Sequence, residues 1–101
     1  MEKVAETELV IQEKISIMIE IVMTITGCEY SDAYKMITAS KTYSYMKAYD
    51  YSVLHDSPQA NLSDIGEELR NSNNKLGVII TENNIKKAML KIREKNLTQA
   101  K

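Results

Sequence analysis

The only histidine, His55, is flanked in sequence by carboxylates at Asp50, Asp56 and Asp64, so this cluster is the first place to look for chemistry. A histidine among carboxylates could hold a metal ion or act as a general base. The spacing matches no metal-ligand pattern, and no third group or oxyanion-hole motif accompanies a His55–Ser57 pair. A histidine at a helix end is instead stabilised by the last carbonyls and by the helix dipole. The sequence therefore predicts no catalytic residue, no metal site and no cofactor.

The single cysteine, Cys28, follows a predicted helix C-terminus, where the partial negative charge opposes formation of a thiolate. A lone cysteine cannot form an internal disulfide, which excludes a disulfide-rich secreted scaffold. We therefore expect Cys28 to pack as a small apolar residue in a protein that is not an enzyme.

All six tyrosines lie between Tyr30 and Tyr51, in a chain without Phe or Trp. Tyrosine anchors protein interfaces and can stack on bases, but here it could also replace the missing aromatic core residues. Helical spacing favours a core position for three of them: Tyr34, Tyr45 and Tyr49. Tyr43 and Tyr51 lie off the predicted apolar stripe, and we predict that they contact a partner.

Basic side chains gather in the C-terminal part of the chain. Residues 1–70 carry six bases against twelve acids, whereas residues 71–101 carry seven bases against two acids. Lys87, Lys91 and Lys95 form a row with helical spacing beside an apolar face. The row could be a solvated face, could pack on the acidic body, could bind an acidic partner protein or could contact phosphates. The net charge of −1 and the isoelectric point of about 5.8 make nucleic acid the weaker of these partners.

Two long apolar patterns indicate helices at the two ends of the chain. Although Ile15, Ile17, Ile19 and Ile21 alternate as in a strand, the longer repeat predicts a helix over about residues 6–26, capped by Gly27. Thr81 is the expected cap of a last helix to about residue 96, with an apolar face made by Ile85, Ala88, Met89 and Ile92.

Between these helices the signals are shorter. Ser31 is the expected cap of a helix to Ala39 with Ala33, Tyr34 and Ile37 inward, and Ser40 caps one to about Val53 with Tyr45, Met46, Tyr49 and Val53 inward. After the loop around Pro58, Asn61 or Ser63 is expected to cap a helix that buries Leu62, Ile65 and Leu69. Residues 71–75 resemble a linker, and the β-prone run 76–80 is expected to dock as irregular chain or, less favoured, to pair as a strand across a dimer.

These elements predict an all-α fold: a bundle of four helices plus a C-terminal amphipathic helix. Residues 1–70 form the expected core domain, and residues 71–101 a linker and basic helix that belong to it or extend as an arm. The composition, 44% hydrophobic with one Pro and three Gly, excludes disordered and fibrous classes. The apolar run 15–25 is too short for a membrane span and acidic residues precede it, so we expect a cytoplasmic protein without a signal peptide.

A family resemblance adds to this interpretation. The sequence Tyr51-Ser52-Val53-Leu54-His55, followed by a short loop and a helix that opens with Asp64-Ile65, resembles domain-of-unknown-function family three-seven-nine-one over roughly residues 8–70. Ser52 and Asp56 stand where members often have Asp and Thr. The resemblance implies a compact helical fold and a small bacterial accessory or antitoxin-like role, often beside a toxin that resembles an ADP-ribosyltransferase. It implies no catalytic residue.

The sequence thus predicts a non-enzymatic interaction protein that binds a companion protein, with Tyr43, Tyr51, Lys87, Lys91 and Lys95 as contact residues. Because so small a domain gains stability from association, a homo-oligomer is also expected. The alternative is a small DNA-binding regulator that uses the basic C-terminal helix. No membrane partner is expected.

Overall fold

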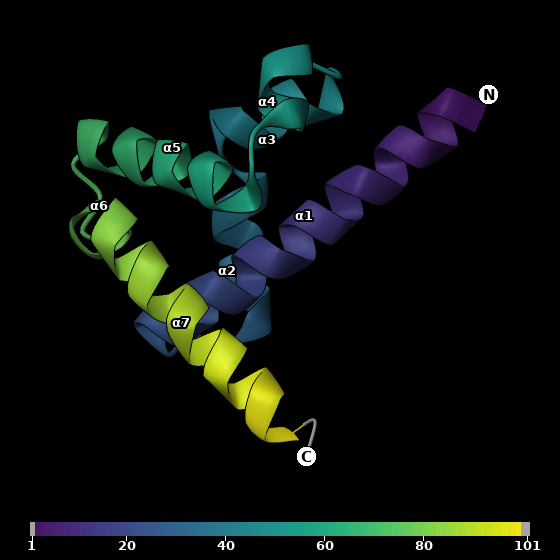
Figure 1. The fold of residues 1–101 in the computed structure, drawn as a ribbon. Helices are drawn as coiled ribbons and strands as arrows, with labels where there is room; N and C mark the ends of the chain where they lie inside the picture. Colours follow the sequence, from purple (N-terminus) through teal and green to yellow (C-terminus); the bar gives the residue numbers. More distant parts are fainter. Residues whose placement is uncertain (1, 100–101) are drawn as a thin grey trace.

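The computed structural model describes the backbone of residues 2–99 and the side chains of residues 5–98, and the described chain is 83% helical without strands. The all-α prediction is confirmed, whereas the predicted count of four helices plus one is wrong. The described part contains seven: α1 Glu2–Thr26, α2 Tyr30–Thr38, α3 Lys41–Lys47, α4 Tyr51–His55, α5 Pro58–Asn71, α6 Leu76–Ile79 and α7 Glu82–Gln99 (Figure 1).

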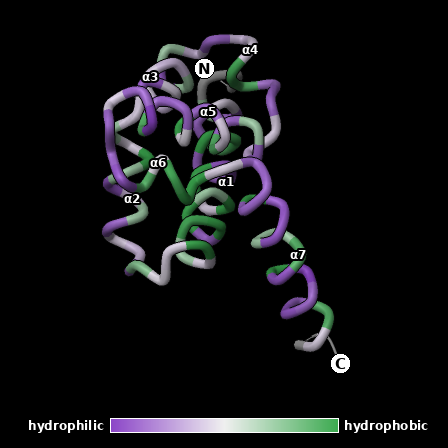
Figure 2. The backbone as a smooth tube through the Cα atoms, turned by 90° about the vertical axis from the view of Figure 1, so that its left-hand side faces the viewer, coloured by the Kyte–Doolittle hydropathy of each residue, from purple (hydrophilic) through white to green (hydrophobic). Residues whose placement is uncertain are grey.

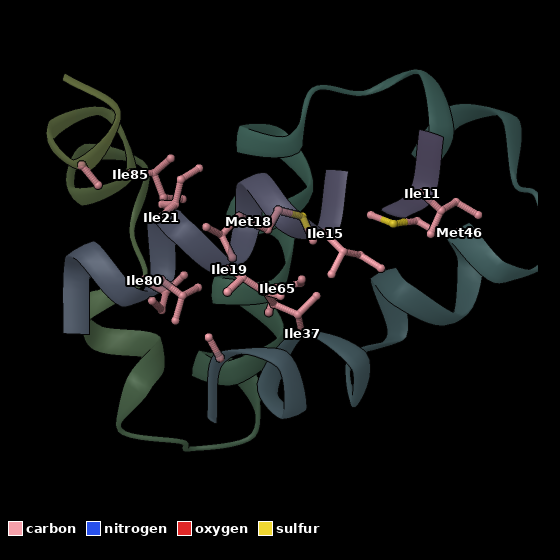
Figure 3. Packing of buried hydrophobic residues seen from close by; sticks show 14 residues of the cluster. Ile11, Ile15, Met18, Ile19, Ile21, Ile37, Met46, Ile65, Ile80 and Ile85 are labelled. Carbon is pink, nitrogen blue, oxygen red and sulfur yellow. The ribbon is translucent and has the colours of Figure 1, made fainter. Parts of the chain in front are cut away.

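Helix α1 is the element around which the others pack. It contacts α2, α5 and α7, and among the described residues it supplies six of the fourteen buried apolar residues of the core, including Met18, Ile19 and Ile21 (Figure 3). Gly27 ends the helix with φ +75°, and its N–H donates to the Met23 carbonyl at 2.8 Å. The expected first helix and its glycine cap are both confirmed, because apolar periodicity and a left-handed glycine are local signals.

Helices α2 and α3 differ from the sequence prediction in the start of α2, the side on which Tyr34 lies and the end of α3. Helix α2 begins at Tyr30, one residue before the expected cap Ser31, and buries Ala33 and Ile37 but not Tyr34. Ser40 does cap α3, accepting the Tyr43 N–H at 3.0 Å, but this helix ends at Lys47 instead of continuing to Val53.

The chain breaks after α3 because Tyr49 adopts a left-handed conformation, with φ +59°. The N–H groups of Tyr49 and Asp50 return to the Met46 and Tyr45 carbonyls, at 3.0 Å each, which is the hydrogen-bond pattern of a Schellman C-cap. Asp50 then accepts the Val53 N–H and starts α4 in a new direction. A tyrosine takes the place that glycine usually holds, so the break could not be predicted from the residue type.

Helix α5 begins earlier than expected. Ser57 is its cap, accepting the Ala60 N–H at 3.1 Å, and Pro58 is the first helical residue, where proline loses no hydrogen bond. Asn61 and Ser63, the expected caps, therefore lie inside the helix, and Asn61 is fully buried. Leu62 and Ile65 face the core as predicted.

Residues 76–79 form the short helix α6, and Ile80 follows as its C-cap, where irregular chain or a strand was expected. The turn docks tightly on α5 at two glycines. A Cβ at Gly66 would lie 2.0 Å from the Ile80 carbonyl oxygen, and one at Gly77 would lie 2.4 Å from the backbone nitrogen of Arg70. Arg70 also donates to the Gly77 and Ile80 carbonyls at 2.8 and 3.1 Å. Tertiary contacts of the backbone thus override the β propensity of the run.

Helix α7 docks through its first half and extends beyond the body with its second half. Thr81 caps it as predicted, accepting the Asn84 N–H at 3.2 Å, and Ile85 and Ala88 are buried. Further along, Leu90 is 57% and Leu97 63% exposed, and Figure 2 shows the C-terminal turns pointing away from the other helices. Within residues 2–99, no helix combines the length and the apolar character needed to cross a membrane.

Candidate functional site

Three tyrosines border one hollow on the side of α1 that faces α2 and α3. Tyr30 and Tyr34 come from α2, Tyr43 comes from α3, and Lys47 and Glu8 complete the rim. The hollow measures about 360 Å³, and its remaining lining comes from α1: Ile11, Gln12, Ile15 and Ser16. We call this hollow, together with the exposed side chain of Tyr49 that contacts Glu8 at its rim, the tyrosine surface.

The outward position of these tyrosines corrects the sequence prediction. Tyr34, Tyr45 and Tyr49 were expected in the core, but each is between 39% and 52% exposed. The short helices bury smaller or unbranched residues instead: Ala33 and Ile37 on α2, and Thr42 and Met46 on α3. Of the two tyrosines expected to be off the core, Tyr43 packs partly against it and borders the hollow.

A polar triad fixes the edge of the tyrosine surface to α1. The Glu8 carboxylate accepts a hydrogen bond from Lys47 Nζ at 2.8 Å and another from the Tyr49 hydroxyl at 2.8 Å. The hydrogen bond from Lys47, and then that from Tyr49, hold the pKa of Glu8 below its ordinary value. The same carboxylate raises the pKa values of Lys47 and Tyr49, because it favours their protonated forms. The triad is therefore a charged, salt-sensitive edge beside an aromatic hollow.

Helix α3 is held in place by a carboxylate from α5. Glu68 accepts the backbone N–H groups of Lys41 and Thr42, at 2.7 and 3.1 Å, and the Thr42 hydroxyl at 2.6 Å. A negative charge at a helix N-terminus satisfies free N–H groups and complements the dipole. Glu68 thus orients the helix that carries Tyr43 and Tyr45.

Helix α4 is held by a buried lysine of α1. Lys14 is only 7% exposed, and its ammonium donates to the Val53 and Asp56 carbonyls, at 2.8 and 2.6 Å, and to Asn61 Oδ1 at 3.0 Å. Burial lowers the pKa of Lys14, while the charge of Asp56 acts in the opposite direction. The three acceptors match the three protons of an ammonium group, so Lys14 joins α1, α4 and α5 as a structural residue. Its burial was not predicted from the sequence.

His55 and Tyr51 lie together on α4, away from the tyrosine hollow. The two rings stack with centroids 3.9 Å apart, and His55 Nδ1 lies 3.0 Å from the Tyr51 carbonyl oxygen. This carbonyl contact at the end of a helix is the structural role expected for His55. Tyr51 is 74% exposed, so the structure places it on the surface, but on a different helix from Tyr43.

The predicted lysine row lies along the junction of α7 with the C-terminal half of α1. Lys87 and Lys91 border a hollow with Thr24, and Lys91 and Lys95 border a second one with Glu20. All three lysines are exposed, so the expected row exists and remains accessible.

A larger apolar groove lies on another side of α7. It measures about 590 Å³ and runs between α7 and the first turns of α5, lined among others by Ala60, Ile85, Met89 and Leu90. Lys86 and Arg93 border it, so the groove combines apolar walls with positive charge. Lys86, Arg93 and Leu90 were not among the predicted contact residues, although their spacing of four and three residues in the sequence places them on one helix face.

No group of three or more His, Cys, Asp or Glu side chains within the described residues is arranged to hold a metal ion. Cys28 is a half-buried free thiol whose backbone N–H is bound by the Thr26 hydroxyl at 3.1 Å. Comparison with protein-family models, curated proteins and solved structures found no match to this chain. The family resemblance noted in the sequence, and the antitoxin-like role that it implies, therefore stay predictions.

Proposed function

We propose that this protein is a non-enzymatic interaction protein that binds a companion protein through the tyrosine surface. One observation carries the proposal. In a chain whose only aromatic residues besides His55 are six tyrosines, the folded structure places Tyr30, Tyr34 and Tyr43 around one hollow and leaves Tyr30 and Tyr34 exposed. Exposed tyrosine rings add little to internal packing, and a group of them around one hollow is typical of a surface that binds a partner.

Tyrosine suits such a surface for physical reasons. It offers a large, stiff apolar body and a hydroxyl that can reach a partner's polar groups, and it is enriched among the residues that dominate binding energy. The Glu8–Lys47 pair lies at the rim of the hollow, where charges guide association more than they add affinity. The partner that fits would insert an apolar side chain between the tyrosines and place polar groups around it. A small accessory or antitoxin-like protein that captures a companion protein would use a surface of this kind.

The experiment is a binding titration with the companion protein. The partner is first identified by capture on the tagged full chain and then purified, and its affinity is measured for the wild type and for Tyr34→Ala. A central tyrosine should contribute about 2 kcal/mol, so Tyr34→Ala should weaken binding about 30-fold. Tyr51→Ala is the matched control on α4. Unchanged affinity for Tyr34→Ala would overturn the proposal, and loss with Tyr51→Ala only would move the binding surface to α4.

The second candidate is a DNA-binding regulator, favoured by the exposed row of Lys87, Lys91 and Lys95 on one helix. Each lysine that neutralises a phosphate adds close to one unit to the slope of log affinity against log salt. DNA retention that falls steeply with salt, with a slope reduced by about one in Lys91→Gln, would support this function. Absent or salt-independent retention would remove it.

A further inference from the structure

Helices α1 and α7 each carry an exposed stripe with the same spacing and opposite charge. On α1, Val10 and Ile17 are seven residues apart and 42% and 40% exposed, and each follows an acidic residue, Glu6 or Glu13, by four positions. On α7, Leu90 and Leu97 are also seven residues apart, and each follows a basic residue by the same four positions. We call these the acidic stripe (Glu6, Val10, Glu13, Ile17) and the basic stripe (Lys86, Leu90, Arg93, Leu97).

The charge contrast extends beyond the stripes. Every exposed or half-exposed charged side chain in residues 5–26 of α1 is acidic, because its one base in that range, Lys14, is buried. On α7, residues 86–95 carry five bases and the single acid Glu94. Two helices with such stripes can pack so that their apolar residues meet and their opposite charges pair, and the charges then select the partner.

The two stripes of one molecule do not face each other. Within the chain, α7 already crosses the C-terminal half of α1, where Ile85 lies near Ile21 in the core (Figure 3). Beyond this crossing the N-terminal half of α1 and the C-terminal half of α7 diverge, as Figure 1 shows. The molecule is accordingly broad and thin, with extents of 41 × 39 × 23 Å. Among the described residues, neither stripe therefore faces a stripe of opposite charge in its own chain.

We infer that a second copy of this chain covers both stripes. The basic stripe of α7 in each copy packs on the acidic stripe of α1 in the other, so that one contact forms twice about a two-fold axis. A second copy fits better than an unrelated partner because it brings both complements at once, in the matching spacing. The inference is independent of the proposed function: α2 and α7 lie on opposite sides of α1 (Figure 2), so the tyrosine surface stays accessible in the dimer.

Sedimentation equilibrium of the full chain gives the first test. The wild type should form a concentration-dependent dimer that weakens as the salt concentration rises, because opposite charges of the two stripes meet in the contact. Leu97→Glu places an acid against the acidic stripe of the partner copy and should raise the dissociation constant of the dimer at least about 30-fold. Val78→Glu is the matched control, because Val78 is 73% exposed on α6, outside both stripes. A monomeric wild type, or a dimer that Leu97→Glu leaves intact, would overturn the inference.

A charge exchange tests the pairing itself. One variant carries Glu6→Lys and Glu13→Lys, so both of its stripes are basic, and the other carries Lys86→Glu and Arg93→Glu, so both are acidic. Each should be monomeric at concentrations where the wild type is dimeric, while their mixture should form a heterodimer, because both contacts then join opposite charges. All four positions are exposed, and circular dichroism checks that each variant is folded. Folded variants whose mixture fails to associate would overturn the pairing of α1 with α7, whatever the companion-protein titration shows.

Discussion

Two regions of this small fold are held together by different physical means. The corner of α5 and α6 is closed by backbone packed against backbone, at Gly66 and Gly77. The segment of α3 and α4 is instead held by single polar side chains from other helices, Glu68 at the start of α3 and Lys14 at the end of α4. The first region has no space for even one extra carbon atom, whereas the second depends on a few hydrogen bonds that can be removed one at a time.

The difference bears on function. The tyrosine surface is built on α2 and α3, so its geometry depends on polar bonds such as those of Glu68. The α5–α6 corner fixes where α7 starts, and so it directs the basic stripe. Damage to the corner should therefore lower global stability, and damage to the polar bonds should mainly disturb the surface that we propose for the companion protein.

The largest expected effect is at the corner. Gly66→Ala would place a carbon 2.0 Å from the Ile80 carbonyl oxygen, so the two backbones must separate. Overpacking of this kind should lower the free energy of unfolding by about 3 kcal/mol, measured by urea denaturation. Gly27→Ala is the control, because no atom lies near a Cβ there and only the left-handed conformation is penalised, by about 1 kcal/mol. Equal losses in the two variants would show that the corner can relax.

The next effect is at Lys14. Lys14→Met keeps most of the side-chain volume but leaves the Asp56 carbonyl and the Asn61 amide oxygen without this donor, while the Val53 carbonyl keeps the hydrogen bond from Asn61 Nδ2. Unpaired buried acceptors should cost about 2 kcal/mol in the free energy of unfolding. Lys35→Met, at an exposed position on α2, should change stability little. If Lys14→Met were as stable as the wild type, the free-energy cost of burying the ammonium group would equal the stabilisation by its hydrogen bonds. The position of α4 would then depend on apolar packing.

A smaller loss is expected at Glu68. Glu68→Ala removes the acceptor of two backbone N–H groups at the start of α3, and loss of an N-terminal cap costs about 1 kcal/mol. Thermal unfolding measures this loss, with the exposed neighbour Glu67→Ala as the control. Since Glu68 orients α3, the variant should also weaken companion-protein binding more than Glu67→Ala does. The opposite ranking would separate the tyrosine surface from this cap.

The smallest effect is a pH dependence at the tyrosine surface. Because its hydrogen bonds hold the pKa of Glu8 below the ordinary value of 4.5, Glu8 stabilises the folded state above that value. This contribution is lost as the pH falls through the lowered pKa, where the carboxylate becomes protonated. Melting temperatures between about pH 3 and pH 6 should therefore fall less steeply for Glu8→Gln than for the wild type. Glu20→Gln, exposed on the same helix and outside the acidic stripe, is the control.

The pKa of Asp64 is shifted in the direction opposite to that of Glu8, which provides an internal check. Desolvation, followed by the neighbouring charge of Asp56, raises the pKa of Asp64, so its protonated form is favoured in the folded state. The contribution of Asp64 to the stability of the folded state therefore becomes more favourable as the pH falls through the raised pKa. Asp64→Asn should make the fall of the melting temperature in acid steeper, whereas Glu8→Gln makes it shallower. Parallel shifts of the two variants would contradict these assignments.

The sequence by itself determined the all-α class, the long helices at both ends, and caps at Gly27, Ser40 and Thr81. These features depend on residues within one or two turns of each other, through apolar periodicity and capping side chains. The charge division and the exposed lysine row were also readable, since a row on one helix face needs only helical spacing.

Only the tertiary structure decided the break at Tyr49, the helical turn at residues 76–79, the burial of Lys14 and the outward position of Tyr34 and Tyr45. For Lys14 the deciding contacts come from far along the chain. Lys14 is buried because acceptors 39 to 47 residues away converge on its ammonium group. The tyrosines face outward because α1 and α5 cover the other sides of two short helices, and local spacing on a short helix cannot say which side its neighbours will cover.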